Sequence, residues 1–313
     1  MSTSKARNIY SSAHAHRSLT FLSLSSLHSA RSANLVECLP VDASAPQWLH
    51  GAKIYSIRGL DGFRLIRCPF ADAAAQLRLV RSALRDWIEP PSLNNLGTAK
   101  GVTAEDAANY SNMWQRHLDE EASGEPSTSL LSKLTWATVG YQYQWTPRCY
   151  DPNCRSPFPA ELSTLAAELA HACGWPTLRP EAAIINLYHP ASTMGGHRDD
   201  AEPDQTSPIV SISLGLDCVY LLGGETKDTP PIAMRLRSGD VIVQGGRSRG
   251  YVHGVPRVLA GTLPTMLRPE NAADSELSPF ARWLLDHRLN INVRQVFEAE
   301  VEGGARKRPR EAG

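Results

Sequence analysis

The sequence predicts an α+β protein whose second half folds as an antiparallel barrel or a double-sheet jelly roll, with helices flanking it. Three observations favour this class. Residues 207–244 contain short apolar strands separated by glycine- and proline-containing turns, a spacing typical of closed or two-layered antiparallel sheets. A last strand follows at residues 288–297, where polar and aliphatic residues alternate. Two stretches nearer the amino terminus carry apolar residues at helical spacing, which indicates amphipathic helices.

The composition limits the classes of protein to consider. The 313 residues carry a formal net charge of zero, so binding to nucleic acid would require a local basic patch. The six cysteines form no C-x2-C pair, and a disulfide framework is unusual in a chain of this length. No apolar run approaches the roughly 20 residues that a transmembrane helix needs. We therefore expect no membrane partner, and we also expect a monomer.

Both ends differ from the rest of the chain. Residues 1–50 are basic and rich in serine, with no acidic residue before Glu37, which fits either a mitochondrial transit segment or a disordered tail. We favour the transit segment, and hence the mitochondrion, over the nucleus or cytoplasm. Residues 299–313 contain the basic cluster Arg306, Lys307, Arg308 and Arg310. This cluster is either a nuclear signal or, as we expect, a solvated tail.

Between these ends, the first folded elements are expected from Ile54 onward. Residues 55–68 predict a strand with a turn, and Asp72 is suited to cap the helix that follows. The apolar residues at helical spacing in this helix are Leu77, Val80, Leu84 and Trp87. Residues 94–129 are polar and predict an irregular excursion. A second helix is predicted at residues 160–173, because Leu162, Leu165 and Leu169 form one apolar stripe.

An aromatic run lies between the two helices. Residues 136–150 read W-A-T-V-G-Y-Q-Y-Q-W-T-P-R-C-Y. Aromatic faces can stack on unpaired bases, and an arginine can bind a phosphate. An ordinary strand with tyrosines on a half-exposed face explains the same pattern. Taken alone, the run favours the ordinary strand.

The stretch at residues 184–199 offers metal ligands. It begins as a strand, turns at Gly195 and Gly196, and ends with His197 and Asp199. Residues i and i+2 of an extended segment point to the same side, so an imidazole and a carboxylate are offered together. With His253 they would complete a facial triad of two histidines and one carboxylate, the ligand set of non-heme Fe(II). The H-x-D pair alone is weak support for such a site.

The last strand strengthens the assignment. In R-L-N-I-N-V-R, Arg288, Asn290, Asn292 and Arg294 share one face, and three aliphatic residues share the other. A solvent-exposed polar face is the simpler interpretation. A face of arginines and amides is also matched to a dicarboxylate, which arginine binds through charge-assisted bonds. Asn186 and Tyr188 share a face of the strand that enters the glycine turn. A dicarboxylate beside a facial-triad iron suggests 2-oxoglutarate as co-substrate.

These motifs together resemble a known family. In order, the chain contains N-x-Y, H-x-D, S-I-S-L-G, L-x-S-G-D-V, H-G-V-P-R and R-x-N-x-x-x-R. This order is similar to that of the AlkB family of Fe(II)- and 2-oxoglutarate-dependent dioxygenases. V-G-Y-Q-Y-Q-W and L-N-I-N-V-R-Q-V look most like its AlkB homologue 1 branch. The resemblance implies a double-stranded β-helix at residues 51–298, with a nucleotide-recognition lid at about 92–157 and a core at about 158–298.

The resemblance also assigns roles to residues. His197, Asp199 and His253 would hold Fe(II). Arg288 would pair with the distal carboxylate of 2-oxoglutarate, helped by Asn290 and Tyr188. Arg294 and Asn186 would contact its other end or orient neighbouring ligands. The lid would recognise a flipped base, which Tyr141 would face; its substrate-binding residues would be Trp136, Tyr141, Tyr143, Trp145 and Arg148.

The implied activity is oxidation by O2 of methylated nucleobases, by demethylation or hydroxylation. The favoured substrate is 1-methyladenine or 5-methylcytosine in tRNA, with DNA as a second candidate. Asn292 stands where the family usually has threonine, and Ala201 offers no hydrogen bond where base-recognising residues vary, so the identity of the base is not transferred. Two alternatives stay open: a 2-oxoglutarate oxygenase acting on protein side chains, and a non-catalytic nucleic-acid-binding barrel.

Overall fold

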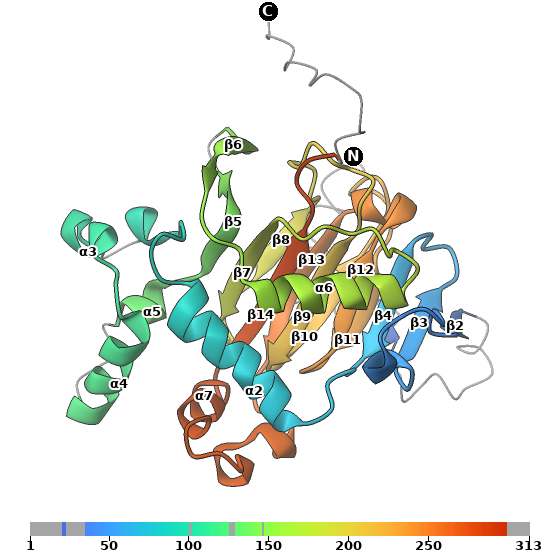
Figure 1. Ribbon diagram of the computed structural model, residues 1–313. Helices are drawn as coiled ribbons and strands as arrows, with labels where there is room; N and C mark the ends of the chain where they lie inside the picture. The colour runs from blue at the N-terminus through green and yellow to red at the C-terminus, as the bar shows by residue number, and fades with distance from the viewer. Residues whose placement is uncertain (1–20, 23–34, 100–101, 125–128, 146, 299–313) are drawn as a thin grey trace, which may run out of the picture.

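The computed structural model describes residues 21–22, 35–99, 102–124, 129–145 and 147–298. Over these residues the chain forms two β-sheets that pack face to face, with helices on the outer side of the larger sheet (Figure 1). From edge to edge, the larger sheet contains β2 (Val36–Leu39), β3 (Lys53–Ile57), β4 (Phe63–Arg67), β12 (Val241–Gln244), β9 (Ile209–Gly215), β14 (Arg288–Arg294), β7 (Ala182–Tyr188), β5 (Trp136–Gln144) and β6 (Cys149–Arg155).

The smaller sheet has five strands. In order they are β1 (Phe21–Leu22), β11 (Ile232–Leu236), β10 (Asp217–Leu222), β13 (His253–Leu259) and β8 (Met194–His197). Within the run from β7 to β14, strands β7, β9, β12 and β14 belong to the larger sheet and β8, β10, β11 and β13 to the smaller. This winding between two layers is that of a double-stranded β-helix, and it confirms the predicted jelly-roll core.

The helices lie outside this core. The α-helices are α2 (Ala73–Ser82), α3 (Ala104–Ala108), α4 (Met113–Ser123), α5 (Leu130–Lys133), α6 (Ala160–Ala172) and α7 (Ser278–Trp283). A π-helical turn (Ala83–Trp87) continues α2, and 3-10 turns occur at Gln47–Leu49, Leu96–Thr98, Gly246–Gly250, Thr265–Leu267 and Pro269–Asn271. None of the helices among the described residues is long and apolar enough to cross a membrane.

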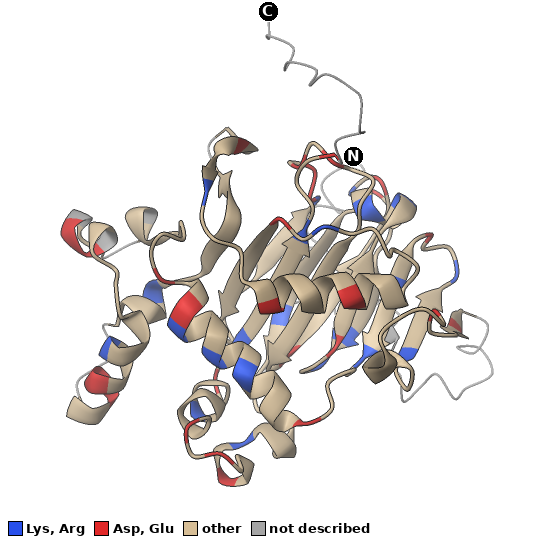
Figure 2. Ribbon diagram, viewed as in Figure 1, with Lys and Arg blue, Asp and Glu red and all other residues tan. Residues whose placement is uncertain are grey.

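Helices α2 and α6 cover the outer face of the larger sheet (Figure 1). The side chain of Asp72 accepts a hydrogen bond from the backbone N–H of Ala75 at 2.7 Å, which confirms the predicted cap of α2. Leu77 of α2 and Leu162 of α6 join one hydrophobic core with the aliphatic side chains of the sheet beneath them. Figure 2 shows basic residues along α2 and acidic residues along α6, so this outer layer is of mixed charge.

Alternation along β14 separates the core from the polar interior. Leu289, Ile291 and Val293 are completely buried in the core beneath the helices. The residues between them point to the opposite face of the strand and therefore toward the smaller sheet. There a second hydrophobic cluster, which includes Phe63 and Leu236, joins the two sheets. The polar side chains of β14 thus enter the space between the sheets next to an apolar core.

Strand β5 changes its pairing partner half-way along its length. Trp136 to Gly140 pair with β7, whereas Tyr141 to Gln144 pair with β6 and form a hairpin. The change occurs at Gly140, whose φ is +75°, and a Cβ there would lie 2.1 Å from the carbonyl oxygen of Glu181. Only glycine fits this combination of backbone angle and contact. The hairpin therefore projects beyond the sheet (Figure 1).

Two expectations about the amino-terminal half were wrong. The folded domain begins before residue 50, because β2 pairs with β3 and Leu49 is completely buried in the core. Residues 94–129 are not simply irregular, since they contain α3 and α4. The ring of Trp114 on α4 stacks on Phe280 with centroids 4.5 Å apart, which holds α4 against the domain. Residues 1–20, 23–34 and 299–313, which include most of the expected transit segment and the basic tail, lie outside the described residues.

Candidate active site

Two histidines are brought together by strand pairing. His197 at the end of β8 and His253 at the start of β13 are direct antiparallel partners, with ring centroids 4.4 Å apart. Nδ1 of His197 lies 3.0 Å from the carbonyl oxygen of Gly195, and Nδ1 of His253 lies 3.2 Å from that of Tyr251. A carbonyl only accepts hydrogen bonds, so each Nδ1 carries the proton. Each Nε2 is left with a lone pair, as a metal ligand requires.

Asp199 completes the group from the loop that follows β8. Its Oδ1 lies 3.6 Å from Nε2 of His197, and its Oδ2 lies 4.0 Å from Nε2 of His253. Among the described residues, these three form the one group of metal-binding type whose ligand atoms all lie within 4.8 Å of one another. The structure therefore brings together the three residues that the sequence predicts as a facial triad.

The protonation states suit metal binding. Burial, followed by the neighbouring His197, lowers the pKa of His253 to about 4. Burial opposes ionisation of Asp199, but Arg294 and the two histidines outweigh it and hold the pKa of this carboxyl well below its usual value. Metal ligands bind as neutral imidazole and as carboxylate. Near neutral pH, His253 and Asp199 are already in those forms.

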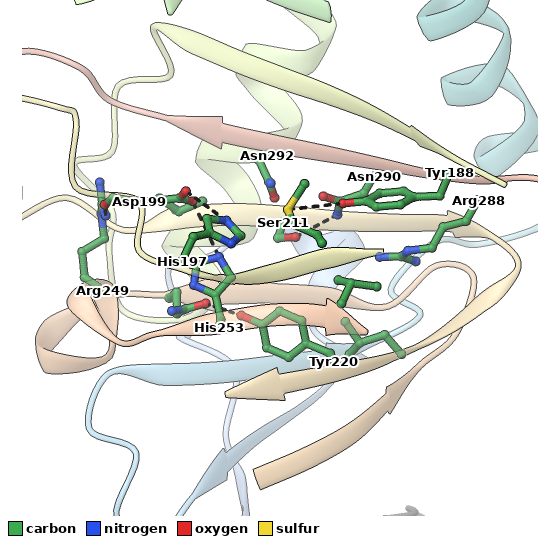
Figure 3. A pocket seen from close by; sticks show the side chains of 15 residues that line it. Tyr188, His197, Asp199, Ser211, Tyr220, Arg249, His253, Arg288, Asn290 and Asn292 are labelled. Carbon is green, nitrogen blue, oxygen red and sulfur yellow. Dashed lines mark hydrogen bonds and ion pairs between the residues drawn. The ribbon is translucent and has the colours of Figure 1, made fainter. Parts of the chain in front are cut away.

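Arg288 lies at the far end of the same pocket from the triad (Figure 3). Only 1% of this residue is exposed, and its Nη2 donates a hydrogen bond to the hydroxyl of Ser213 at 3.0 Å. Its Nε and Nη1 are buried and have no hydrogen-bond partner among the described residues. Buried cationic donors normally have an acceptor. The pocket is therefore suited to an anionic group opposite the triad.

The two residues expected to assist Arg288, Tyr188 and Asn290, differ in what they contact. Tyr188 faces Arg288 across β7 and β14, and its ring centroid is 5.9 Å from the guanidinium carbon. The amide nitrogen of Asn290 donates to the hydroxyl of Ser211 at 2.9 Å and to the carbonyl oxygen of Ile212 at 3.1 Å. Both N–H groups of Asn290 are therefore taken up by β9. Asn290 lines the pocket, but it braces two strands rather than offering a free donor.

Sequence reasoning missed several residues that line this pocket. Ser211 and Tyr220 face it, and Tyr220 donates to the side-chain oxygen of Gln244 at 2.7 Å (Figure 3). The serines had a detectable signal, because S-I-S places Ser211 and Ser213 on one face of a strand. No sequence pattern indicates Tyr220 or Gln244, because their hydrogen bond depends on the contact between the two sheets.

Comparison with known proteins identifies the family. A model described as the 2OG-Fe(II) oxygenase superfamily matches residues 97–294. The chain is 35% identical over 266 residues to the nucleic acid dioxygenase ALKBH1 of Homo sapiens, covering 79% of this chain and 67% of the human protein. It is 36% identical over 251 residues to the DNA N(6)-methyladenine demethylase ALKBH1A of Arabidopsis thaliana, covering 71% and 72%. It is 31% identical over 258 residues to the tRNA demethylase abh1 of Schizosaccharomyces pombe, covering 78% and 82%.

The chain belongs to the AlkB family of 2OG-Fe(II) oxygenases. The residues of this AlkB-family oxygenase fit the family's cofactors. Two imidazoles and one carboxylate are the ligand set of a facial-triad iron, and this set leaves positions open for other ligands. The partnerless N–H groups of Arg288 fit one carboxylate of 2-oxoglutarate. Bound Fe(II) with 2-oxoglutarate and O2 supplies an oxidant for C–H bonds.

A second cavity of this oxygenase is lined by two members of the triad, His197 and Asp199. It has a volume of about 400 Å³, and His197, Asp199 and Asn186 line its inner end. Tyr143, Trp145 and Arg148 of the β5–β6 hairpin region line its outer wall. His197 and Asp199 thus line both a narrow pocket that contains Arg288 and a wider cavity that is flanked by aromatic side chains.

Two expectations about the substrate side require correction. Tyr141 does not line the cavity: its ring packs edge-on against Phe297 at 4.8 Å, and Arg155 lies over it. The pairing of β5 with β6 shifts register between Tyr141 and Tyr143. Tyr143, which was also expected to bind substrate, does line the cavity. Trp136 also lies outside the cavity lining and packs against Trp145, with ring centroids 4.8 Å apart.

Glu202 lies three residues after Asp199, in the segment where base-recognising residues vary within the family. Its carboxylate is completely buried and accepts from Arg249 and Arg294, each at 2.8 Å. Both of its oxygens are therefore engaged by arginines and are not free to recognise a base. Arg249 was not anticipated from the sequence, which gives no sign that it pairs with a residue 47 positions earlier.

Proposed function

We propose that this oxygenase oxidises methyl groups of nucleobases, with tRNA as the favoured substrate and DNA as the second candidate. Within tRNA, 1-methyladenine and 5-methylcytosine are the bases proposed. The similar proteins are named as a nucleic acid dioxygenase, a DNA N(6)-methyladenine demethylase and a tRNA demethylase, and these names support a nucleic-acid substrate. His197, Asp199 and His253 are the proposed iron ligands, and Arg288 is the proposed partner of 2-oxoglutarate.

The observation that carries this proposal is the cavity beside the triad. Its volume of about 400 Å³ falls in the range of ligand-binding clefts. Tyr143 lines its wall, and Trp145, which is 46% exposed, stands beside it. A base must leave its stack before an enzyme can reach its methyl group, and aromatic side chains stabilise it once it has left. An aromatic-walled cavity that opens onto the metal ligands is suited to this task.

Arg148 is the proposed contact for the nucleic-acid backbone. Its guanidinium lies 3.4 Å from Asp200, and the two side chains are 67% and 44% exposed. Such exposed ion pairs contribute little free energy, so a phosphate can replace the carboxylate at little cost. Arg198 lies 3.8 Å from the same Asp200, which provides a second cation at the mouth of the cavity.

The decisive experiment is a product assay. Protein loaded with Fe(II) is incubated with 2-oxoglutarate and with tRNA stem-loops that contain 1-methyladenine or 5-methylcytosine, or with DNA that contains N6-methyladenine. Mass spectrometry of the nucleosides should show loss of methyl from 1-methyladenine or hydroxylation of 5-methylcytosine, and Asp199→Ala should show neither. Turnover on peptides alone, with every nucleic acid unchanged, would support the protein-oxygenase alternative and exclude this proposal.

We also propose the mitochondrion as the setting. The basic, serine-rich composition of the first 35 residues supports this proposal. The test is amino-terminal sequencing of the protein recovered from purified mitochondria. A mature protein that starts downstream of these residues is expected, and a protein that starts at Met1 and is found only outside the organelle would contradict it.

A further inference from the structure

The three members of the triad are not held in the same way. His197 and His253 are fixed by the pairing of β8 with β13. Asp199 lies two residues beyond β8, in a loop without regular secondary structure. Strand pairing therefore does not fix its position, and other contacts must hold its carboxylate toward the two imidazoles.

Two buried arginines make those contacts. Nη2 of Arg294, on β14, lies 3.5 Å from Oδ2 of Asp199. Nη1 of Arg249, in the 3-10 turn that precedes β13, donates a hydrogen bond to the backbone carbonyl of Asp199. One arginine thus holds the side chain of Asp199, and the other holds its backbone. Each residue is at most 3% exposed, so solvent does not compete for either guanidinium.

Glu202 links the two arginines. Oε1 accepts from Nη1 of Arg294 and Oε2 accepts from Nη2 of Arg249, both at 2.8 Å. With Asp199 the four residues form one connected group that carries two positive and two negative charges. If the charge of Glu202 is removed, two buried cations remain near one carboxylate. Buried charges need partners, so both guanidiniums would then compete for Asp199 and draw it away from the histidines.

We propose that Glu202 is a positioning residue, which holds Arg249 and Arg294 in the orientation that directs Asp199 to the metal. The proposal rests on the proposed role of Asp199 as a ligand, and it is independent of which substrate the enzyme oxidises. Residues that orient metal ligands typically change metal affinity by about 10–100-fold when they are replaced.

The test measures metal binding by the full-length apo protein, with Co(II) as an air-stable probe for the Fe(II) site. Visible absorption reports both the dissociation constant and the coordination of bound Co(II). Glu202→Gln keeps the size of the side chain but places an amide N–H2 against one guanidinium, so we expect binding about 10–100-fold weaker and an altered spectrum. Glu202→Asp keeps the charge and should give an intermediate affinity.

Arg249→Lys tests the other side of the contact. A single ammonium cannot reach Glu202 and the carbonyl of Asp199 as a planar guanidinium does. Because both residues act through one contact, the double variant Glu202→Gln/Arg249→Lys should bind Co(II) about as weakly as the weaker single variant. Effects that multiply instead would show that the two residues act separately and would overturn the proposal. If Glu202→Gln does not fold, as judged by circular dichroism, Glu202→Asp and Arg249→Lys provide the test.

Two further variants separate the outcomes. Asp240→Asn also removes a buried carboxylate that pairs with an arginine, Arg67, but at a site outside the pocket, and it should bind Co(II) like the wild type. Asp199→Ala tests the ligand itself. If Asp199→Ala leaves Co(II) binding intact, the proposed ligand role fails. If Asp199→Ala weakens binding but Glu202→Gln stays within twofold of the wild type, only the positioning role fails.

Discussion

Arg288 donates one hydrogen bond to Ser213, at 3.0 Å, and its two other buried nitrogens have no hydrogen-bond partner in the described part of the chain. A folded protein rarely leaves a guanidinium in this condition unless a ligand completes it. Arg288 is therefore expected to bind a carboxylate. The triad lines the same pocket as Arg288, so a ligand whose carboxylate binds Arg288 would extend toward the triad (Figure 3).

Replacement of Arg288 should weaken 2-oxoglutarate binding. Arg288→Ala removes the buried cation, and the loss is expected to be about 3–5 kcal/mol, measured by calorimetry on the Mn(II)-loaded protein. Arg288→Lys keeps the charge without the two parallel N–H groups and should fall between Arg288→Ala and the wild type. Arg282→Ala, on the exposed side of α7, is the matched control. Equal affinities for Arg288→Ala and the control would exclude the assigned role.

Tyr143 and Tyr141 should differ in their importance for substrate. Tyr143 lines the cavity, whereas Tyr141 packs on Phe297. Tyr143→Ala should weaken binding of the methylated oligonucleotide by about 1–3 kcal/mol, the value of one stacking contact. Tyr141→Ala should change it much less. Fluorescence anisotropy on the two variants measures the difference, and a larger loss for Tyr141→Ala would reverse the assignment.

Gly140→Ala should disrupt the hairpin. The new Cβ would lie 2.1 Å from the carbonyl oxygen of Glu181, at a φ of +75°. The backbone angle alone costs alanine about 1–2 kcal/mol, and the contact adds to it. Gly174→Ala is the matched control, because Gly174 has a φ of +94° and a Cβ there would have no atom of the described residues within 4 Å. Thermal unfolding should show a clearly larger loss for Gly140→Ala, and equal losses would mean that β5 tolerates the displacement.

His287 should make stability depend on acid pH. Burial, and then the nearby His189, lower the pKa of His287 to about 4, whereas an unfolded histidine titrates near 6.5. The folded state thus binds the proton less readily, so this contribution to stability is complete above pH 6.5 and declines as the pH falls toward 4. Its size is on the order of 3 kcal/mol. His287→Gln should lose less stability than the wild type between pH 7 and pH 4. Denaturant unfolding at each pH measures the free energy of unfolding, and an equal decrease for the two proteins would contradict the prediction.

The sequence predicted most of the catalytic centre because its pattern is local. Alternation along residues 288–294 distinguishes the polar face of β14 from its buried face, and the two-residue spacing of His197 and Asp199 places both near one point. His253 completes the proposed triad from a distant segment, and the family's motif H-G-V-P-R supported that choice. The alternation of Ser211 and Ser213 carried the same kind of information and was overlooked.

What the sequence did not predict depends on contacts between distant segments. The register shift between Tyr141 and Tyr143 arises where β5 and β6 pair. The engagement of Glu202 requires Arg249 and Arg294, which lie 47 and 92 residues away. The amino-terminal boundary was placed too late because β2 is a short strand that β3 stabilises. Contacts between segments that are distant in the sequence cannot be inferred from composition or periodicity.

The alternation of β14 has a consequence for how this enzyme tolerates change. Each of its inward residues serves the site, and each outward residue fills the core beneath the helices. A deletion or insertion of one residue within the strand would exchange the two sets, since every side chain would turn to the opposite face. The guanidinium groups of Arg288 and Arg294 would then point into the hydrophobic core. At the same time, aliphatic side chains would point into the co-substrate pocket. Stability and activity are therefore expected to fail together in this strand.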